Sequence, residues 1–418
     1  MIPEIKAILK QITVQNSSTP AEKAKDYRFT KRMKSTPRSF IREILKVTQS
    51  PDVISFAGGL PNPALIDTAG IAKAARAVLA RDGSKALQYA TTEGDPSLRE
   101  FISERYKKRL GLDIPADEIL ITNGSQQCLD LIGKVFIDPK DDIAIERPGY
   151  LGAIQAFSLY EPRFHAIPLG DNGPDPSVLE RTVKRHRIRL MYGIPNSQNP
   201  SGITYSAQRR EETAQILAGT SAIFVEDDAY GELTFSGRTL PSMRSSLPDQ
   251  TILTGSFSKI LAPGMRLGWI SAPPPVMEKI IVAKQATDLH SNYLSQRIAS
   301  QYLSENNIDA HITNIRNAYH AQCTCMLDRI RAEFPDGVRY TKPAGGMFIW
   351  ITLPAGCCSM EVFESALKEH IAVLPGIPFY VDGGGTDTLR LNFSNSDEMK
   401  IRAGIQKLGS VIAALSGA

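Results

Sequence analysis

An α/β fold, with a largely parallel sheet wrapped by helices and a smaller α+β part after it, is what the sequence predicts. From about residue 118 to residue 272, short apolar stretches alternate with stretches of helical periodicity. The apolar stretches lack the polar–apolar alternation of a half-exposed strand, so both faces of each strand should be buried. A chain of 418 residues is too long for one ordinary hydrophobic core, and a second domain is therefore expected.

The first part of this pattern gives the sheet and its helices. The expected strands are 118–122, 142–146, 189–194, 222–226, 251–255 and 267–271. The expected helices between them are 126–137, 176–186 and 207–218. Strands that alternate with helices are typical of a parallel sheet, because a parallel connection needs a crossover and the crossover is usually a helix.

The second part of the pattern is less regular. Residues from 274 to about 334 have the periodicity of long helices. They are followed by expected strands at 339–340, 347–352 and 388–392, a helix near 359–370 and a final helix from about 397. This mixture predicts a smaller α+β domain.

Composition and charge argue against several classes of protein. Hydrophobic residues make up 42% of the chain and charged residues 22%, as in a soluble globular protein. The 48 Lys and Arg nearly balance the 44 Asp and Glu, and the net charge of +4 is too small to indicate nucleic-acid binding. The five cysteines form no CxxC pair and the six histidines are scattered, so we expect reduced thiols and no metal site.

The N-terminal segment differs from the rest of the chain. Charged residues near the start without a following apolar stretch argue against a signal peptide. No run approaches the roughly 18–20 apolar residues that span a bilayer, so a cytoplasmic protein without membrane contact is expected. Residues 1–36 include a possible short helix at 2–12 and a basic stretch. We expect them to form an arm that is mobile or docked on a partner.

Ligands of open α/β sheets bind beyond the carboxyl ends of the strands, so the residues that follow each strand are the candidate site. Asn123, Gly124, Ser125 and Gln126 follow the first strand and open a helix. Free backbone N–H groups at such a helix start make a cradle for an anion. The alternative is that Ser125 is an ordinary helix N-cap.

Two further strand ends carry polar or aromatic side chains. Tyr150 follows the second strand and could cover a flat ligand, although a tyrosine of the core or of a turn is equally compatible. Asn199 lies in a loop that two prolines and a glycine restrict. Its amide could donate to a ligand oxygen, and a structural Asx turn is the alternative.

The last two strand ends combine an acid with a lysine. Asp227 follows an apolar strand, where a carboxylate is costly unless it is solvated or paired. Lys259 follows the next strand among small residues, which suits a reactive amine whose pKa is lowered by desolvation and a nearby cation. Arg266 could supply that cation or hold a phosphate.

The order and spacing of these residues resemble the fold-type-I aminotransferases of the aspartate aminotransferase superfamily, from about residue 39 to the last helix. Within it the chain is most similar to the 2-aminoadipate/kynurenine aminotransferase branch, in the stretches 55–61, 87–89 and 343–348. The stretch 39–43 resembles the mobile substrate-recognition helix of bacterial 2-aminoadipate enzymes. The matching superfamily motifs are Gly124-Ser125-Gln126, Tyr150, Asn199-Pro200, Asp227-x-x-Tyr230, Ser256-x-Ser258-Lys259, Arg266 and Arg390.

The resemblance implies a fold and a division into domains. The fold would be that of the pyridoxal-phosphate-dependent transferases of type I, with a mostly parallel seven-stranded sheet in the large domain. The large domain would span 76–300, and the small α+β domain would combine 37–75 with 301–418. Residues 1–36 would remain an arm.

The resemblance also implies the cofactor and its ligands. Pyridoxal 5′-phosphate would be held as an internal aldimine on Lys259, which would also act as the catalytic base. Asp227 would pair with the ring nitrogen, Tyr230 and Asn199 with the phenolic oxygen, and Tyr150 would cover the ring. The phosphate would be bound by Gly124, Ser125, Gln126, Ser256, Ser258 and Arg266, and by Tyr89 from the second subunit of a homodimer.

For the substrate, the resemblance implies reversible transfer of an amino group between an amino acid and a 2-oxo acid, with 2-oxoglutarate expected as that acid. Arg390, with Asn199 and the backbone of Gly59, would bind the α-carboxylate. Ser39 and Arg42 of the recognition helix would meet the side chain, which would be 2-aminoadipate-like, acidic, or large and apolar or aromatic. The alternatives are a β-lyase or decarboxylase of the same fold, and a regulator that binds the cofactor without catalysis.

Overall fold

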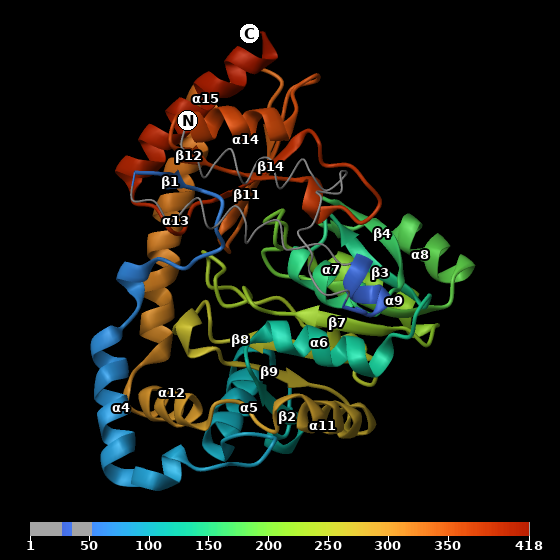
Figure 1. Cartoon of the computed structure of the whole chain (residues 1–418), viewed down its shortest axis with the longest axis vertical. Helices are drawn as coiled ribbons and strands as arrows, with labels where there is room; N and C mark the ends of the chain where they lie inside the picture. Colours follow the sequence, from blue (N-terminus) through green and yellow to red (C-terminus); the bar gives the residue numbers. More distant parts are fainter. Residues whose placement is uncertain (1–26, 36–51, 418) are drawn as a thin grey trace.

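The computed structural model describes residues 27–35 and 52–417, and within them an eight-stranded sheet forms the larger layer of the molecule (Figure 1). The strand order is β2-β9-β8-β7-β6-β3-β4-β5. The strands are β2 (Ile119–Thr122), β3 (Asp142–Arg147), β4 (Arg163–Gly170), β5 (Gly173–Pro174), β6 (Ile188–Gly193), β7 (Ile223–Asp227), β8 (Thr251–Ser256) and β9 (Gly268–Ser271).

Strand directions confirm a mostly parallel sheet. The neighbouring pairs from β4 through β3, β6 and β7 to β8 are all parallel. Strand β9 is antiparallel to both β8 and β2, so β2 points the same way as the parallel strands. The seven strands from β2 to β4 form the expected sheet, and the two-residue β5 adds an eighth strand at the edge.

Helices cover this sheet and fill the connections between its strands. Helix α6 packs on β2, β8 and β9, and α8 packs on β4. Several strands are buried along their whole length, as in β2 and β8, where every residue is buried. The helices are α4 (Thr68–Asp82), α5 (Pro96–Leu110), α6 (Ser125–Phe136), α7 (Leu151–Ser158), α8 (Pro176–Arg185), α9 (Ala207–Ala218), α10 (Met243–Ser246), α11 (Pro274–Asp288) and α12 (Tyr293–Glu305).

A second, smaller layer lies at the top of Figure 1 and contains a four-stranded sheet of order β10-β11-β14-β13. Helix α15 packs against α13 and α14 beside it. Strand β1 pairs with β12, which joins residues 54–55 to the last quarter of the chain. The elements are β1 (Ile54–Ser55), α13 (Ile308–Glu333), β10 (Arg339–Tyr340), β11 (Phe348–Thr352), α14 (Ser359–Lys368), β12 (Ile371–Ala372), β13 (Leu374–Pro375), β14 (Thr388–Asn392) and α15 (Glu398–Ser416).

Short elements complete the described chain. Helix α2 (Lys31–Ser35) lies apart in the sequence, between stretches outside the described residues. The remaining short turns are the 3-10 helices η2 (Pro63–Leu65), η3 (Gly83–Leu87), η4 (Ala116–Glu118), η5 (Pro263–Met265) and η6 (Ile377–Phe379). In the part of the chain that the structure describes, no helix is both long and apolar enough to cross a bilayer.

Most expected elements agree with the structure within a residue or two, and the differences have physical reasons. Helix α6 begins at Ser125 rather than 126, directly after Gly124, whose positive φ of 76° ends the preceding loop. Strand β4 was not expected, because only Ile167 of its eight residues is buried and it therefore has no apolar run. The division into domains stays a prediction, and the expected helix at 2–12 and the stretch 39–43 lie outside the described residues.

Candidate active site

Five strands end at one edge of the large sheet. Because β2, β3, β6, β7 and β8 point the same way, their carboxyl ends meet there. Each is followed by one of the candidate residues Ser125, Tyr150, Asn199, Tyr230 and Lys259. The candidate site is therefore assembled by the topology of the sheet from segments that are far apart in the sequence.

Lys259 follows β8 at this edge and is partly buried. Its Nζ donates a hydrogen bond to the carbonyl oxygen of Gly59 at 2.9 Å, which brings the segment after β1 to the site. Burial, followed by the positive charges of Arg390 and Arg266, lowers the pKa of the Lys259 amine to about 8. A much larger fraction of this amine than of an ordinary lysine is therefore neutral, and hence nucleophilic, near neutral pH.

Asp227, the last residue of β7, is only 2% exposed. Its Oδ2 accepts a hydrogen bond from the Tyr192 hydroxyl at 2.8 Å. Its buried Oδ1 has no hydrogen-bond partner within the described part of the chain. Burial raises the pKa of Asp227 to about 6, although the bond from Tyr192 opposes this. A buried acceptor without a partner costs about 1–3 kcal/mol, so this oxygen marks the place of a donor supplied by a ligand.

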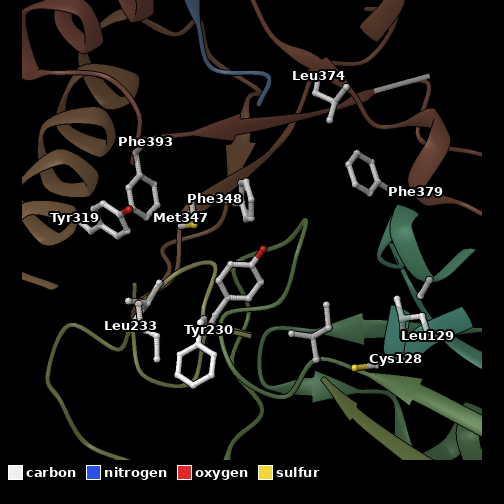
Figure 2. Packing of buried hydrophobic residues seen from close by; sticks show 14 of the residues in the cluster. Cys128, Leu129, Tyr230, Leu233, Tyr319, Met347, Phe348, Leu374, Phe379 and Phe393 are labelled. Atoms are coloured by element: carbon white, nitrogen blue, oxygen red, sulfur yellow. The ribbon is translucent and has the colours of Figure 1, made fainter. Parts of the chain in front are cut away.

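A chain of hydrogen bonds connects the two layers at the site. The Arg390 guanidinium, on β14, donates through NH1 to Oδ1 of Asn199 at 2.8 Å. Nδ2 of Asn199 in turn donates to the Tyr230 hydroxyl at 3.4 Å. Figure 2 shows the rings of Tyr230 and Phe348 close together, with centroids 5.9 Å apart and an edge-to-face angle of 80°. These contacts fix the phenol and the amide of this group relative to each other.

Arg390 is a buried cation without an anionic partner. It is 2% exposed, and no carboxylate of residues 27–35 or 52–417 forms an ion pair with it. Its NH2 donates to the Ala57 carbonyl at 2.6 Å, and its guanidinium carbon lies 4.3 Å and 5.4 Å from the ring centroids of Phe348 and Phe379. Burial lowers the pKa of Arg390 to about 10. An unpaired buried charge is costly, so the geometry indicates a site for an anionic group.

An anion cradle forms at the start of α6. Gly124 leaves room for Arg266: a Cβ on Gly124 would lie 2.6 Å from Arg266 NH2. That NH2 donates to the Asn123 carbonyl at 3.3 Å. A Cβ on Gly268 of β9 would likewise lie 2.8 Å from the Ser125 backbone nitrogen. The guanidinium and the helix N-terminus therefore lie side by side, as an anion site requires.

Four other predicted ligands lie near this cradle in less direct arrangements. Ser256 ends β8, and its Oγ accepts the backbone N–H of Ser258 at 3.1 Å, so these two residues share one turn. The Gln126 side chain is exposed and donates to the Gly152 carbonyl at 2.9 Å, which leaves its backbone N–H as the group at the helix start. Tyr150 precedes α7, and its ring packs on Gly152.

Of the predicted residues that the structure describes, Tyr89 does not join this group within the single chain. Tyr89 is 79% exposed in the single chain, and its ring lies edge-on to His290 with the centroids 5.8 Å apart. Ser39 and Arg42 lie outside the described residues.

Residues 54–408 match the family model of the class I and II aminotransferases. The chain belongs to this family of aminotransferases. The match covers the two sheets and every site residue located above, and it confirms the resemblance and the type I transferase fold inferred from the motifs.

Relatives of known name agree with this aminotransferase assignment. The chain is 42% identical to the 2-aminoadipate transaminase of Thermus thermophilus, over 90% of this chain and 94% of the relative. It is 40% identical to aromatic-amino-acid aminotransferase 1 of Thermococcus litoralis, over 92% of this chain and 94% of the relative. Its fold is similar to the crystal structure of the Thermus thermophilus α-aminoadipate aminotransferase complexed with N-(5′-phosphopyridoxyl)-L-leucine, with a TM-score of 0.88, 40% identity and coverage of 93% and 98% of the two chains.

Pyridoxal phosphate is the cofactor of this aminotransferase. Three features of its own residues fit that group. The unpaired Oδ1 of Asp227 offers an acceptor for a protonated ring nitrogen. The cradle beside Gly124 offers a guanidinium and a helix N-terminus for a phosphate. The Lys259 amine, with its lowered pKa, offers a nucleophile for an aldehyde.

The sequence motifs did not point to some residues that the aminotransferase site depends on. Tyr192 holds Asp227, and its place one residue before the end of β6 could have indicated it. Gln198 is fully buried and donates to the Glu146 carboxylate at 3.0 Å and to the Pro148 carbonyl at 2.8 Å. This network supports the loop that carries Asn199, and a buried acid at the end of an apolar strand was its only signal.

A second group of residues that could bind a metal ion lies at the opposite ends of the strands, where β3 and β4 begin. His165 and His186 stack with ring centroids 4.0 Å apart, and His165 Nε2 lies 2.8 Å from an Asp142 oxygen. The structure thus gathers two histidines that looked scattered in the sequence. Arg163 donates to both oxygens of Asp142 at 2.8 Å and lowers the pKa of that carboxyl. The carboxylate already has a cationic partner, so the cluster is explained as an ion-paired surface group.

Proposed function

We propose that this aminotransferase transfers the amino group of a 2-aminoadipate-like, other acidic, or large apolar or aromatic amino acid to 2-oxoglutarate, with its cofactor held covalently by Lys259. One observation carries the proposal. Three groups lie together at the carboxyl ends of the strands. They are the Lys259 amine with its lowered pKa, the buried Asp227 carboxyl with an oxygen that has no partner, and the buried Arg390 guanidinium without an ion pair. These are the three groups that amino transfer on this cofactor needs.

The bound cofactor supplies an electron sink for the electron pair released at the substrate Cα. Asp227, as the buried carboxylate, keeps the ring nitrogen protonated, because the ion pair offsets the cost of burying the carboxylate charge. Tyr230 would donate a hydrogen bond to the phenolic oxygen of the cofactor ring. Asn199, which is bonded to Tyr230, would donate to the same oxygen. Lys259 would take the proton from the substrate Cα and give it up again, as base and then as acid.

The phosphate is held at the start of α6. The backbone N–H groups of this helix N-terminus and the adjacent Arg266 guanidinium would bind it. The assigned phosphate ligands are Gly124, Ser125, Gln126, Ser256, Ser258 and Arg266, with Tyr89 from the second subunit of a homodimer.

Arg390 binds the substrate α-carboxylate through paired hydrogen bonds. Its buried charge without an anionic partner supports this role, and Gly59 allows the backbone to approach the same carboxylate. A carboxylate that is held in place favours loss of the Cα proton over loss of CO₂. Arg390→Gln is therefore expected to lower kcat/KM for every amino acid by roughly 100-fold or more, as loss of a charged hydrogen-bonding partner does.

The side-chain preference comes from two supporting facts. Two relatives with about 40% identity are named for 2-aminoadipate and for aromatic amino acids. Two aromatic rings, Phe348 and Phe379, flank the guanidinium that would hold the carboxylate. Arg42, predicted to act together with Ser39, is the candidate cation for a distal carboxylate.

The test is a panel of amino acids against 2-oxoglutarate, pyruvate and glyoxylate, scored by initial rates of new amino acid and new 2-oxo acid. The proposal expects the highest kcat/KM with 2-oxoglutarate and with a 2-aminoadipate-like, acidic or aromatic donor. Release of ammonia with pyruvate, or of CO₂, in place of a new amino acid would contradict it. Arg42→Ala, compared with the parent on 2-aminoadipate and on leucine, should lose rate on 2-aminoadipate alone.

A further inference from the structure

Helix α11 ends in a strained turn. Leu289 has φ 62° and ψ −60°, a region that residues with a side chain rarely adopt, and the His290 N–H bonds to the Asp288 carbonyl at 2.7 Å. Strain of this kind persists only where surrounding contacts hold it in place. The two residues that flank Leu289 make such contacts, and they reach two different loops.

Asp288 holds the loop that forms the anion cradle. Its Oδ2 accepts from Nδ2 of Asn123 at 2.6 Å and from Nε2 of Gln127 at 2.7 Å. Oε1 of Gln127 accepts the Asn123 backbone N–H at 2.8 Å. One carboxylate thus bonds to residues on both sides of Gly124 and Ser125, and it sets the position of the phosphate-binding loop in its own subunit.

Lys284 locks this carboxylate in place. No part of its side chain is exposed, and its Nζ donates to Oδ1 of Asp288 at 2.7 Å and to Oε1 of Gln127 at 3.1 Å. A buried ammonium is costly unless it is paired and hydrogen-bonded. The pair therefore leaves Asp288 little freedom to turn away from the loop.

His290 holds a different loop. Its Nδ1 lies 2.8 Å from the Ser291 carbonyl and its Nε2 lies 3.3 Å from the Ala90 backbone nitrogen. These partners require the neutral ring with its proton on Nδ1, because Nε2 must accept from Ala90. The ring edge meets Tyr89, at an interplanar angle of 88°. His290 is the side chain that orients an otherwise exposed tyrosine.

We propose that Asp288 and His290 are positioning residues for two different active sites. Asp288 orders the phosphate loop of its own subunit. His290 orders Tyr89, which reaches the phosphate in the partner subunit. The inference rests on the proposed function, in which Tyr89 crosses a homodimer interface. The three-residue turn then connects the cofactor sites of the two subunits.

Heterodimers with one labelled site test this directly. Lys259→Ala is placed in one subunit, so that borohydride fixes the cofactor only to the subunit that keeps Lys259. The second substitution is placed either in the same subunit as Lys259→Ala or in the other one. The readout is the cofactor concentration that gives half-maximal labelling, which does not depend on turnover.

The two substitutions should give opposite patterns. His290→Ala should raise the half-saturating concentration about 3- to 10-fold when it shares a subunit with Lys259→Ala, and leave it unchanged in the other arrangement. Asp288→Asn should raise it about 10- to 100-fold, as expected for lost charge-assisted bonds, only when it lies in the labelled subunit. Asn123→Ala repeats that second pattern without breaking the pair of Lys284 and Asp288.

Controls separate the outcomes. Glu278→Gln, an exposed carboxylate on the same helix α11, should change neither arrangement. Both substitutions acting in the same arrangement, or neither acting in any, would overturn the inference. Absence of label on Lys259 in the parent dimer would instead overturn the proposed function, so the two failures are distinguishable.

Discussion

At the scale of single residues, the site contains two groups whose pKa values are shifted in opposite directions. Burial makes Lys259 a weaker base, with a pKa of about 8, and makes Asp227 a weaker acid, with a pKa of about 6. Both shifts disfavour the charged form in the cofactor-free protein. A cofactor that brings a cationic ring nitrogen to Asp227 and an aldehyde to Lys259 relieves both costs, so its binding should be favourable beyond the contacts of its phosphate.

Asp227→Asn should separate cofactor retention from catalysis. The variant keeps the shape of the site and should retain cofactor, but it cannot stabilise a protonated ring, so turnover should fall by roughly 100-fold or more. Half-reaction rates with glutamate, measured by the absorbance of the bound cofactor, check this. Turnover equal to that of the parent would contradict the role of Asp227.

The same substitution should raise the free energy of unfolding of the cofactor-free protein, by an amount that depends on pH. The pKa of Asp227 is raised on folding, so the penalty for its charge is present above about pH 6 and disappears as the pH falls toward the ordinary carboxyl value. Cofactor-free Asp227→Asn should therefore be more stable than the parent at pH 8, by up to about 3 kcal/mol, and the difference should shrink at pH 4. Urea unfolding at both pH values measures it.

Capture of the cofactor should report the lowered pKa of Lys259. The amine attacks an aldehyde only when neutral, so the rate should rise with pH and level off above about pH 8. Rapid-mixing absorbance of cofactor-free protein with pyridoxal phosphate gives this profile. A rate that still rises steeply at about pH 10, as an ordinary lysine would give, would contradict the shift.

At the scale of elements, the loop after β6 shows how a predicted ligand depends on residues that no motif marks. The side chain of Gln198 donates to Glu146 and Pro148, and its oxygen accepts the backbone N–H and the hydroxyl of Ser201 at 2.7 Å and 2.6 Å. These bonds connect Gln198 to Glu146 of β3 and to Ser201, on the other side of Asn199 in the same loop. A buried network of hydrogen bonds thus stabilises the conformation of this loop.

Gln198→Ala should destabilise the fold and loosen Asn199. It leaves Glu146 and the Ser201 N–H with fewer partners, and a loss of about 2–4 kcal/mol is expected for a broken buried network. Denaturant unfolding gives the magnitude, with Gln208→Ala, an exposed glutamine on α9, as the matched control. A change no larger than that of the control would show that the network does not hold the loop.

The order of the elements was predictable from the sequence, because a buried strand appears in the sequence as a continuous apolar run. The polar residues that follow each run mark its end. Lys259, Asp227 and Asn199 were found in this way. Contacts between distant segments were not predictable, since periodicity says nothing about which strand end meets which loop. The bond from Arg390 to the carbonyl of Ala57 joins residues 333 positions apart.

At the scale of the whole molecule, one predicted phosphate ligand, Tyr89, is expected to act only in a dimer. Tyr89 is mostly exposed, and His290 contacts its ring and bonds to the next residue, Ala90. Two exposed apolar side chains, Leu87 two residues before Tyr89 and Leu289 next to His290, would be covered if two subunits met at this face. The homodimer is therefore expected to complete the phosphate site.

Tyr89→Phe tests this without disturbing packing. It removes one hydroxyl, so the half-saturating cofactor concentration should rise about 5- to 10-fold, while sedimentation still gives a dimer. Tyr340→Phe, in β10 of the small sheet, serves as the control. Unchanged cofactor affinity would exclude Tyr89 from the phosphate site.

The most direct measurement is chemical. The protein is saturated with pyridoxal phosphate, reduced with borohydride and digested, and the modified peptide is identified by mass. The account predicts one phosphopyridoxyl group per subunit, on the ε-nitrogen of Lys259, and none in Lys259→Ala. A modified Lys284, or a Lys259 that stays unmodified at saturating cofactor, would contradict it.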